Sequence, residues 1–277
     1  MMLALLCLSA GFALAQTKPT HENAAPESYP VWWETGGRLG LAKLEDAAAS
    51  FAEPFSKDDL DSLRRLPNGY SGPPRPEVHN CKELLALIDP NDYHSPKRVE
   101  AWGMIGSRCA ELRELAHAVP ARRSAIPNSV WTPAVVSLLP SGIFAAYDEK
   151  SRQASMEANK KGLSLRQYWE QVAAAEARQN GKGPKGPATD HRFSFIEEGL
   201  IISLGPDLRD DSEIGVCACN GDGYSVVARG DFDGDGWEDI LIEAGWSFYR
   251  SPLQYYAVYL LTRKSEDGRF EIVKQVF

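Results

Sequence analysis

The chain has 277 residues, a formal net charge of −8 and 43% hydrophobic residues, a composition that allows a globular protein with a substantial core. Acidic charge is concentrated in residues 195–240, which hold 12 acidic and 2 basic side chains, and no basic stripe suited to nucleic acid occurs anywhere. No transmembrane segment is expected, because no run of about eighteen uninterrupted apolar residues is present.

The first fifteen residues have the features of an export signal. They are uncharged and apolar and end in the small-x-small triplet Ala13-Leu14-Ala15 before Gln16. We therefore predict a signal peptide over residues 1–15 and an exported protein, either periplasmic or secreted. Residues 16–30 contain Pro, Ala and polar residues without any period, so a flexible lead is expected there.

Residues 31–180 are predicted to form a helical region. A Ser56 cap precedes one apolar run, and the capping box Ser164-Leu165-Arg166-Gln167 opens another. The first apolar set at helical spacing is Leu39, Leu41, Leu44 and Ala48. Residues 181–189, which are rich in Gly, Pro and Lys, indicate a linker or an exposed loop.

Four cysteines remain after removal of the leader, and an even number in an oxidising compartment favours disulfides. Cys81 lies near the start of a predicted helix that runs to about Ile88. Cys109 lies within a second helix, expected from the Ser95-Pro96 cap to about Ala118. Two helices joined by a short connection fold back antiparallel, which brings the two cysteines close together. We predict a disulfide between Cys81 and Cys109, against the alternative of two buried thiols.

Cys217 and Cys219 are separated by one residue in a predicted strand. Such a pair shares a face of the strand but is too far apart to bridge without a bend. A strained local disulfide and two buried thiols stay open, and zinc binding is a weaker alternative because a second ligand pair is missing.

Residues 190–277 are predicted to form an antiparallel β domain, so the fold class is α+β. Asn220-Gly221-Asp222-Gly223 and Glu266-Asp267-Gly268 have the composition of hairpin turns, which favours a meander. Leu253–Thr262 is apolar on both faces and is therefore expected to be a central strand. The predicted strands are Arg192–Ile196, Leu200–Leu204, Ile214–Cys219, Tyr224–Arg229, Ile240–Phe248, Leu253–Thr262 and Phe270–Val276.

The segment Gly230–Asp239 is the strongest functional signal in the chain. Its carboxylates recur at alternate positions and would repel one another without a cation. Side-chain oxygens at positions 1, 3, 5 and 9 and a backbone carbonyl at position 7 match the irregular oxygen shell of calcium better than the strict octahedron of magnesium. The predicted ligands are Asp231, Asp233, Asp235, the Trp237 carbonyl and Asp239.

An EF-hand is excluded, because its twelfth position requires Glu and here is Ile242, and because β-type residues flank the loop. The sequence Gly-Asp-Phe-Asp-Gly-Asp-Gly-Trp-Glu-Asp-Ile-Leu-Ile at residues 230–242 resembles the calcium loop of FG-GAP or integrin-α-like repeats. The resemblance implies a structural calcium ion held by the same five residues. Proteins of that family repeat the motif around a propeller, whereas the second copy here, Asn220–Tyr224, lacks the third acid, so a full propeller is not expected.

The acidic loop also allows two other interpretations, an ordinary turn and a catalytic metal site. An Asp/Gly-rich run also occurs in ordinary hairpin turns. A catalytic metal needs an open coordination position, and a shell filled by protein oxygens does not provide one.

No catalytic residue is assigned, because the chain has no Gly-x-Ser-x-Gly, His-Glu-x-x-His, Ser-x-x-Lys or phosphate-binding glycine loop. We interpret the chain as an exported calcium-binding protein that acts as a binding or interaction module toward an unidentified protein or envelope partner. The alternatives are a periplasmic inhibitor or immunity-type protein, and an enzyme such as a hydrolase of unrecognised type. A deep pocket that combines His191 or His94 with a carboxylate would favour the enzyme.

Overall fold

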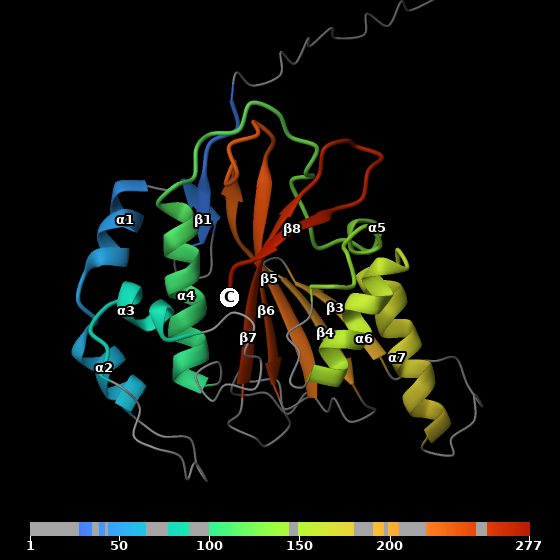
Figure 1. Cartoon of the computed structure of the whole chain (residues 1–277). Helices are drawn as coiled ribbons and strands as arrows, with labels where there is room; N and C mark the ends of the chain where they lie inside the picture. Colours follow the sequence, from blue (N-terminus) through green and yellow to red (C-terminus); the bar gives the residue numbers. More distant parts are fainter. Residues whose placement is uncertain are drawn as a thin grey trace, which may run out of the picture.

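The computed structural model describes the chain over ten stretches, arranged as Figure 1 shows. They are residues 28–34, 39–41, 44–64, 77–88, 100–143, 149–179, 191–196, 199–204, 220–247 and 254–277. The predicted leader (1–15), most of the lead (16–30), the linker (181–189), Cys217 and Cys219 lie outside the described residues.

The fold is α+β, as predicted, with helices on both faces of an antiparallel sheet. The helices are α1 (Leu44–Ala52), α2 (Lys57–Arg64), α3 (Cys81–Ala86), α4 (Glu100–Leu115), α5 (Pro133–Val136), α6 (Glu149–Lys160) and α7 (Leu165–Gln179). The strands are β1 (Trp32–Glu34), β2 (Leu39–Leu41), β3 (His191–Ile196), β4 (Gly199–Leu204), β5 (Asn220–Gly230), β6 (Asp239–Ser247), β7 (Gln254–Thr262) and β8 (Glu271–Gln275).

Two helix starts follow the capping signals of the sequence. The Ser56 hydroxyl accepts the Asp59 N–H at 3.1 Å, one residue before α2 begins. At α7 the box is reciprocal, since Ser164 Oγ accepts the Gln167 N–H at 3.2 Å and Gln167 Oε1 accepts the Ser164 N–H at 2.9 Å. Both predicted caps are confirmed, because each satisfies backbone donors that the first helical turn leaves free.

The strands from β3 to β8 form an antiparallel meander, and β1 and β2 extend the sheet. The strand order is β2-β1-β5-β6-β7-β8, and β4 also pairs with β5. One edge of the long strand β5 is shared, because β4 pairs with its first half and β1 pairs with Ala228 and Arg229.

The hairpin turn predicted at Asn220–Gly223 is wrong. These residues begin β5 and pair with β4 on one side, as in Asp222↔Ile202, and with β6 on the other, as in Asp222↔Trp246. Pairing on both sides outweighs the local turn preference of Gly and Asp. The second predicted turn is confirmed, since residues 265–268 join β7 to β8 and the Gly268 N–H donates to the Ser265 carbonyl at 3.0 Å.

The helical interpretation of Leu39 and Leu41 is also wrong. Both residues lie in β2, where Leu41 pairs with Trp32 of β1, and β1 in turn pairs with β5. The spacing of a few apolar residues does not distinguish a short strand from the start of a helix. Here pairing with β1, which itself pairs with the distant strand β5, determines that the segment is a strand. Leu44 and Ala48 do belong to a helix, α1, as predicted.

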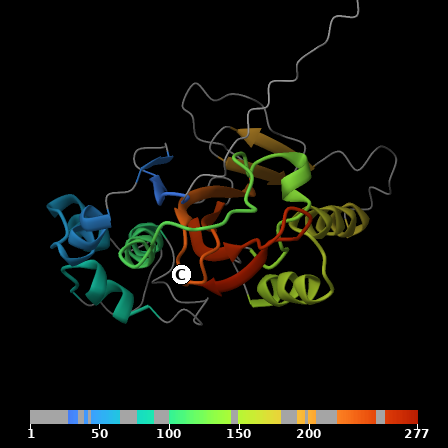
Figure 2. The same ribbon diagram turned by 90° about the horizontal axis from the view of Figure 1, so that it is seen from above.

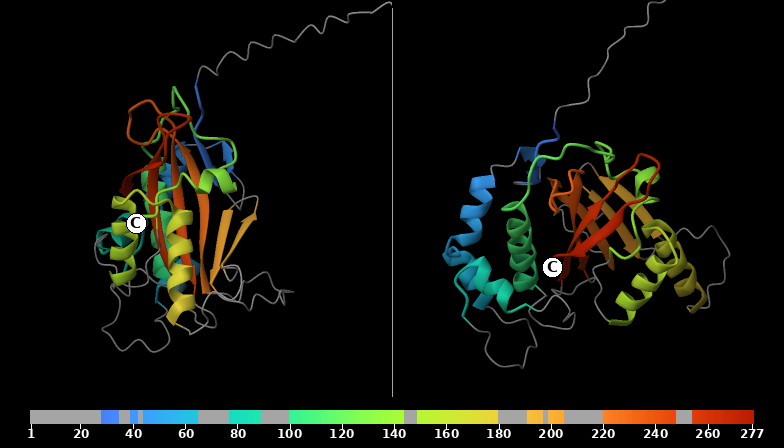
Figure 3. Two further views of the ribbon diagram at one scale, coloured as in Figure 1. Left: turned by 90° about the vertical axis from the view of Figure 1, so that its right-hand side faces the viewer. Right: turned by 45° about the horizontal axis from the view of Figure 1, so that its top comes forward.

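The sheet lies between two groups of helices, with α1–α4 on one face and α5–α7 on the other (Figure 2). Successive residues of β7 pack against opposite groups: Tyr259 and Leu261 join the core with α5–α7, whereas Val258 and Leu260 join the core with α1–α4. β7 pairs with β6 and β8, so the prediction of a central strand is confirmed. The loop between β5 and β6, the turn between β7 and β8 and the connection after α4 gather at the same end of the sheet (Figure 3).

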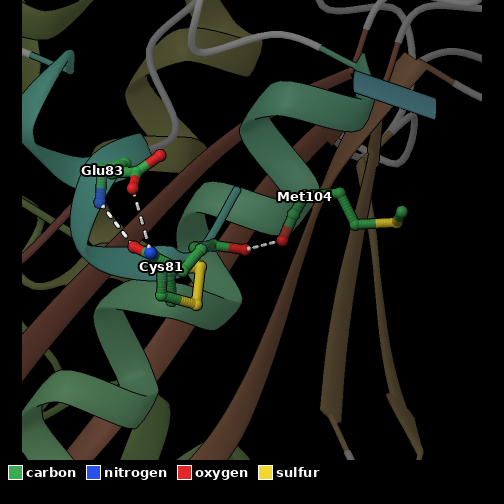
Figure 4. The surroundings of a disulfide bond; sticks show 6 residues. Cys81, Glu83 and Met104 are labelled. Atoms are coloured by element: carbon green, nitrogen blue, oxygen red, sulfur yellow. Dashed lines mark hydrogen bonds between the residues drawn. A yellow bond between two sulfur atoms is a disulfide. The ribbon is translucent and has the colours of Figure 1, made fainter. Parts of the chain in front are cut away.

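The predicted disulfide between Cys81 and Cys109 is present and joins the first turn of α3 to α4 (Figure 4). The two Cα atoms are 5.1 Å apart, and the cysteines are 3% and 1% exposed. Met104 of α4 directs its side chain away from the disulfide and is half exposed. The bond therefore lies inside the core between the sheet and α1–α4.

Candidate metal centre

The acidic loop is the connection between two adjacent strands. Gly230 is the last residue of β5, Asp239 is the first of β6, and the two residues form the last pair of the β5–β6 ladder. The loop begins and ends on a rigid base, because β5 and β6 lie within the sheet. The structure thus agrees with the inference that the loop joins strands rather than helices.

Three of the predicted ligands are brought together. Asp231, Asp233 and Asp239 each offer a carboxylate oxygen, and these three oxygens lie within 4.8 Å of one another. Asp231 is 3% exposed and Asp239 is 0% exposed, whereas Asp233 is exposed. Oxygens from two buried residues and one exposed residue are thus close enough to bind one hard cation together.

Backbone N–H groups shape the loop around these carboxylates. Asp231 accepts the N–H groups of Gly234 at 2.7 Å and Gly236 at 2.8 Å, one on each oxygen, and Asp233 accepts the Asp235 N–H at 3.0 Å. Gly234 and Gly236 have φ values of 80° and 86°. These left-handed conformations strain any residue with a Cβ, which explains why glycine occupies both positions.

One carboxylate oxygen of Asp239 is buried and makes no hydrogen bond of good geometry. Its Oδ2 accepts the Phe232 N–H at 3.1 Å, while its Oδ1 is buried without a hydrogen-bond partner. Thr262, which pairs with Asp239 in the β6–β7 ladder, likewise has a buried hydroxyl outside hydrogen-bonding geometry. A buried carboxylate oxygen without a donor is costly unless a cation or water satisfies it.

The surroundings of Asp239 strongly change its acidity. Burial, helped to a smaller extent by the charges of Asp233 and Asp235, raises the pKa of its carboxyl to about 7. The nearby Thr262 hydroxyl and the Phe232 N–H oppose this increase only in part. Because burial, and to a smaller extent the neighbouring acids, disfavour its charged form, a cation bound beside Asp239 would favour its ionisation.

Asp235 is placed differently from the other predicted ligands and is not part of the group of three. Its Oδ2 forms an ion pair with Lys264 Nζ at 2.5 Å, and its Oδ1 accepts the Trp237 N–H at 2.8 Å. Partial burial acts to raise the pKa of Asp235, but Lys264 and the Trp237 N–H outweigh it and hold that pKa below its usual range. The hydrogen bond to Asp235 correspondingly raises the pKa of Lys264.

The connection between α4 and α5 forms backbone hydrogen bonds with the acidic loop. This contact was not predicted from the sequence. Val119 exchanges two backbone hydrogen bonds with Asp231, each 2.9 Å long. The Gly236 carbonyl accepts the N–H groups of Arg122 at 3.0 Å and Arg123 at 3.1 Å. These contacts join residues that are far apart in the chain, so no local sequence signal could have predicted them.

A second feature that the sequence analysis missed is a buried ion pair beside the predicted ligands. Glu238 is 2% exposed, binds Arg229 through both carboxylate oxygens at 2.9 Å each, and accepts a hydrogen bond from the Ser124 hydroxyl. The sequence offered one signal for this pair: Arg229 and Glu238 are oppositely charged and stand next to Gly230 and Asp239, the two ends of the loop. Glu238 thus pairs with Arg229 at the base of the β5–β6 hairpin, whereas its neighbour Asp239 belongs to the group of three carboxylates.

The described residues do not test whether His94 or His191 lies in a pocket with a carboxylate, as an enzyme would require. His94 lies outside the described residues, and His191 begins β3 with its side chain undescribed.

No helix of the described residues is long and apolar enough to cross a membrane. In comparisons with known proteins, no family model matches the chain, and no curated protein or solved structure matches it either.

Proposed function

We propose that the chain is an exported calcium-binding protein in which the β5–β6 loop holds a structural Ca²⁺ ion, and that it acts as a binding module. The observation that carries the calcium proposal is the convergence of Asp231, Asp233 and Asp239, whose carboxylate oxygens lie within 4.8 Å of one another. Asp239 Oδ1 is buried there, close to the Thr262 hydroxyl but without a hydrogen bond of good geometry. A cation would satisfy this oxygen and neutralise the three converging carboxylates.

The donor set supports calcium over other metals. The converging atoms are carboxylate oxygens, and no cysteine or histidine belongs to the described group, which disfavours zinc and copper. Calcium accepts six to eight oxygens in irregular geometry, and the resemblance to FG-GAP loops implies two further ligands, Asp235 and the Trp237 carbonyl. Asp235 would have to leave Lys264 to join them.

The position of the loop supports a structural role. A cation held by Asp231 and Asp239 would fasten the end of β5 to the start of β6, and through Asp231 it would stabilise the pairing with Val119. Its free energy of binding would thereby stabilise the folded state.

Two separate features support export. The predicted leader over residues 1–15 is one, and the buried disulfide between Cys81 and Cys109 is the other, because disulfides persist in oxidising compartments. Extracellular and periplasmic fluids also supply more free calcium than cytosol, which suits a site of modest affinity.

The test of the metal site is a thermal melt with calcium and with chelator. Calcium should raise the melting temperature of the wild type and leave that of Asp239→Asn unchanged. Asp267→Asn, which removes an exposed acid from the β7–β8 turn, should respond like the wild type. The double variant Asp233→Ala and Asp235→Ala should also lose the shift. A wild-type melt that does not depend on calcium would refute the proposal.

The test of export and binding uses the native host. Sequencing of the mature N-terminus should place it at Gln16, and fractionation should place the protein outside the cytosol. An affinity pull-down from the envelope, repeated with chelator, should recover a partner that depends on the folded loop. A mature protein that keeps residues 1–15 would contradict export.

A further inference from the structure

Lys264 lies where a cation at the acidic loop would have to compete with it. Its ammonium contacts Asp235 Oδ2 at 2.5 Å, and its side chain is 53% exposed. Lys264 follows Thr262 by two residues, and Thr262 pairs with Asp239 in the β6–β7 ladder. The lysine therefore reaches the loop from just beyond the end of the neighbouring strand β7.

Contacts of the preceding residue, Arg263, hold the backbone beside Lys264 in place. Arg263 is 6% exposed, and its guanidinium donates to the carbonyls of Gly268 and Ala125, each at 2.9 Å. The same guanidinium lies over the Phe270 ring at 5.6 Å. The backbone from which Lys264 projects is thus fixed to both the β7–β8 turn and the α4–α5 connection.

We infer that Lys264 is a built-in competitor of the metal ion, which occupies Asp235 while the site is empty and lowers its affinity for divalent cations. This inference rests on the proposed calcium site. In the absence of metal, the ammonium partly neutralises an acidic loop that would otherwise repel itself. When a dication binds, Asp235 turns from Lys264 to the metal, and the remaining ammonium repels the ion.

The consequence is a site tuned to calcium-rich fluid. The three converging carboxylates, joined by Asp235 when it turns to the metal, would favour tight binding, and the loss of the Lys264–Asp235 contact offsets part of that gain. The expected dissociation constant lies in the range of extracellular calcium modules, on the order of 10⁻⁴ to 10⁻³ M. Magnesium, which is slow to shed its waters, would displace the lysine less readily.

Calorimetric titration with Ca²⁺ tests the role of Lys264 through one charge deletion and two controls. Lys264→Met keeps the length of the side chain without its charge, and its dissociation constant should fall about tenfold, as expected for removal of one like charge close to the ion. Lys264→Arg keeps the charge and should stay near the wild-type affinity. Lys274→Met removes a lysine of β8 that is similarly exposed and pairs with Glu114 of α4 at 2.8 Å, and it should change the affinity less than about twofold.

The outcomes separate this inference from the proposed function. Wild-type binding with equal or weaker binding by Lys264→Met would overturn the role of Lys264 and leave the calcium site intact. Binding by Lys264→Met alone at millimolar calcium would support the competitor role. Absence of binding by both proteins would refute the calcium site and this inference together. Melts in chelator, in which each variant should show one cooperative transition, verify that both variants are folded.

Discussion

Arg229 and Glu238 form a two-point ion pair across the base of the acidic loop, with both N···O distances at 2.9 Å. Their side chains are 12% and 3% exposed. Arg229 also donates to the carbonyls of Ile126 and Pro127, so the pair attaches the α4–α5 connection to the end of the β5–β6 hairpin. Removal of either charge leaves the other one buried and uncompensated.

Glu238→Gln should therefore lower the free energy of unfolding by about 3 kcal/mol. Urea denaturation in the presence of chelator measures this loss without a contribution from metal binding. The matched control is Glu157→Gln, whose carboxylate pairs with Lys160 at 2.6 Å but is 56% exposed, and which should cost less than about 1 kcal/mol. Equal losses in the two variants would show that burial of the Arg229 pair is unimportant.

Calcium affinity should depend on pH through Asp239. Burial raises the pKa of this carboxyl to about 7, so between about pH 4 and pH 7 the folded chelated protein holds a proton that the unfolded chain has released. This contribution to stability is fully present below pH 4 and is lost as the pH rises through 7. Calcium in the proposed site must displace that proton, so its affinity should rise up to about tenfold per pH unit below pH 7 and level off above it.

Calorimetric titrations between about pH 5 and pH 8 measure this dependence. In chelator, Asp239→Asn should lose the part of the decline in stability that falls between pH 4 and pH 7. A wild-type calcium affinity that stays constant over this range would contradict the assignment of Asp239 as a ligand that must ionise.

Gly236→Ala should destabilise the protein by about 1–2 kcal/mol, because the residue has a φ of 86° and a Cβ is strained there. Steric overlap does not contribute, since an added Cβ would meet only Arg122 Cδ, at 4.0 Å. Gly223→Ala in β5 is the control, because a Cβ there meets no atom within 4 Å. Urea denaturation should find the control within about 0.5 kcal/mol of the wild type or slightly more stable. A neutral Gly236→Ala would argue against the left-handed loop conformation.

Replacement of both Cys81 and Cys109 by Ala should lower the free energy of unfolding by about 3–4 kcal/mol, because the bond closes a loop with a sequence separation of 28. Denaturation of the oxidised wild type and the double variant measures the difference. Free thiols at both positions in a non-reduced peptide map would disprove the bond, and equal stability of the two proteins would contradict the expected contribution.

Several features of the fold and the site were predictable because their signals are local. The alternating carboxylates of residues 231–239, the flanking β-branched runs and the cap at Ser164 each occupy a short window of the sequence. The pairing of Cys81 with Cys109 followed from helix geometry over a short connection. These inferences needed no knowledge of distant parts of the chain.

By itself, therefore, the sequence determined the α+β class, the disulfide and an acidic loop between two strands. Only the tertiary structure decided that Leu39–Leu41 extends the sheet, that Asn220–Gly223 is strand rather than turn, and that Lys264 holds Asp235. The reason is sequence separation: Arg229 meets Pro127 and Ile126 across 102 and 103 residues, and such partners become neighbours only when the sheet packs between its two helical layers. Contacts of this kind outweigh local preference, because pairing and burial contribute more free energy than the propensity of a few residues.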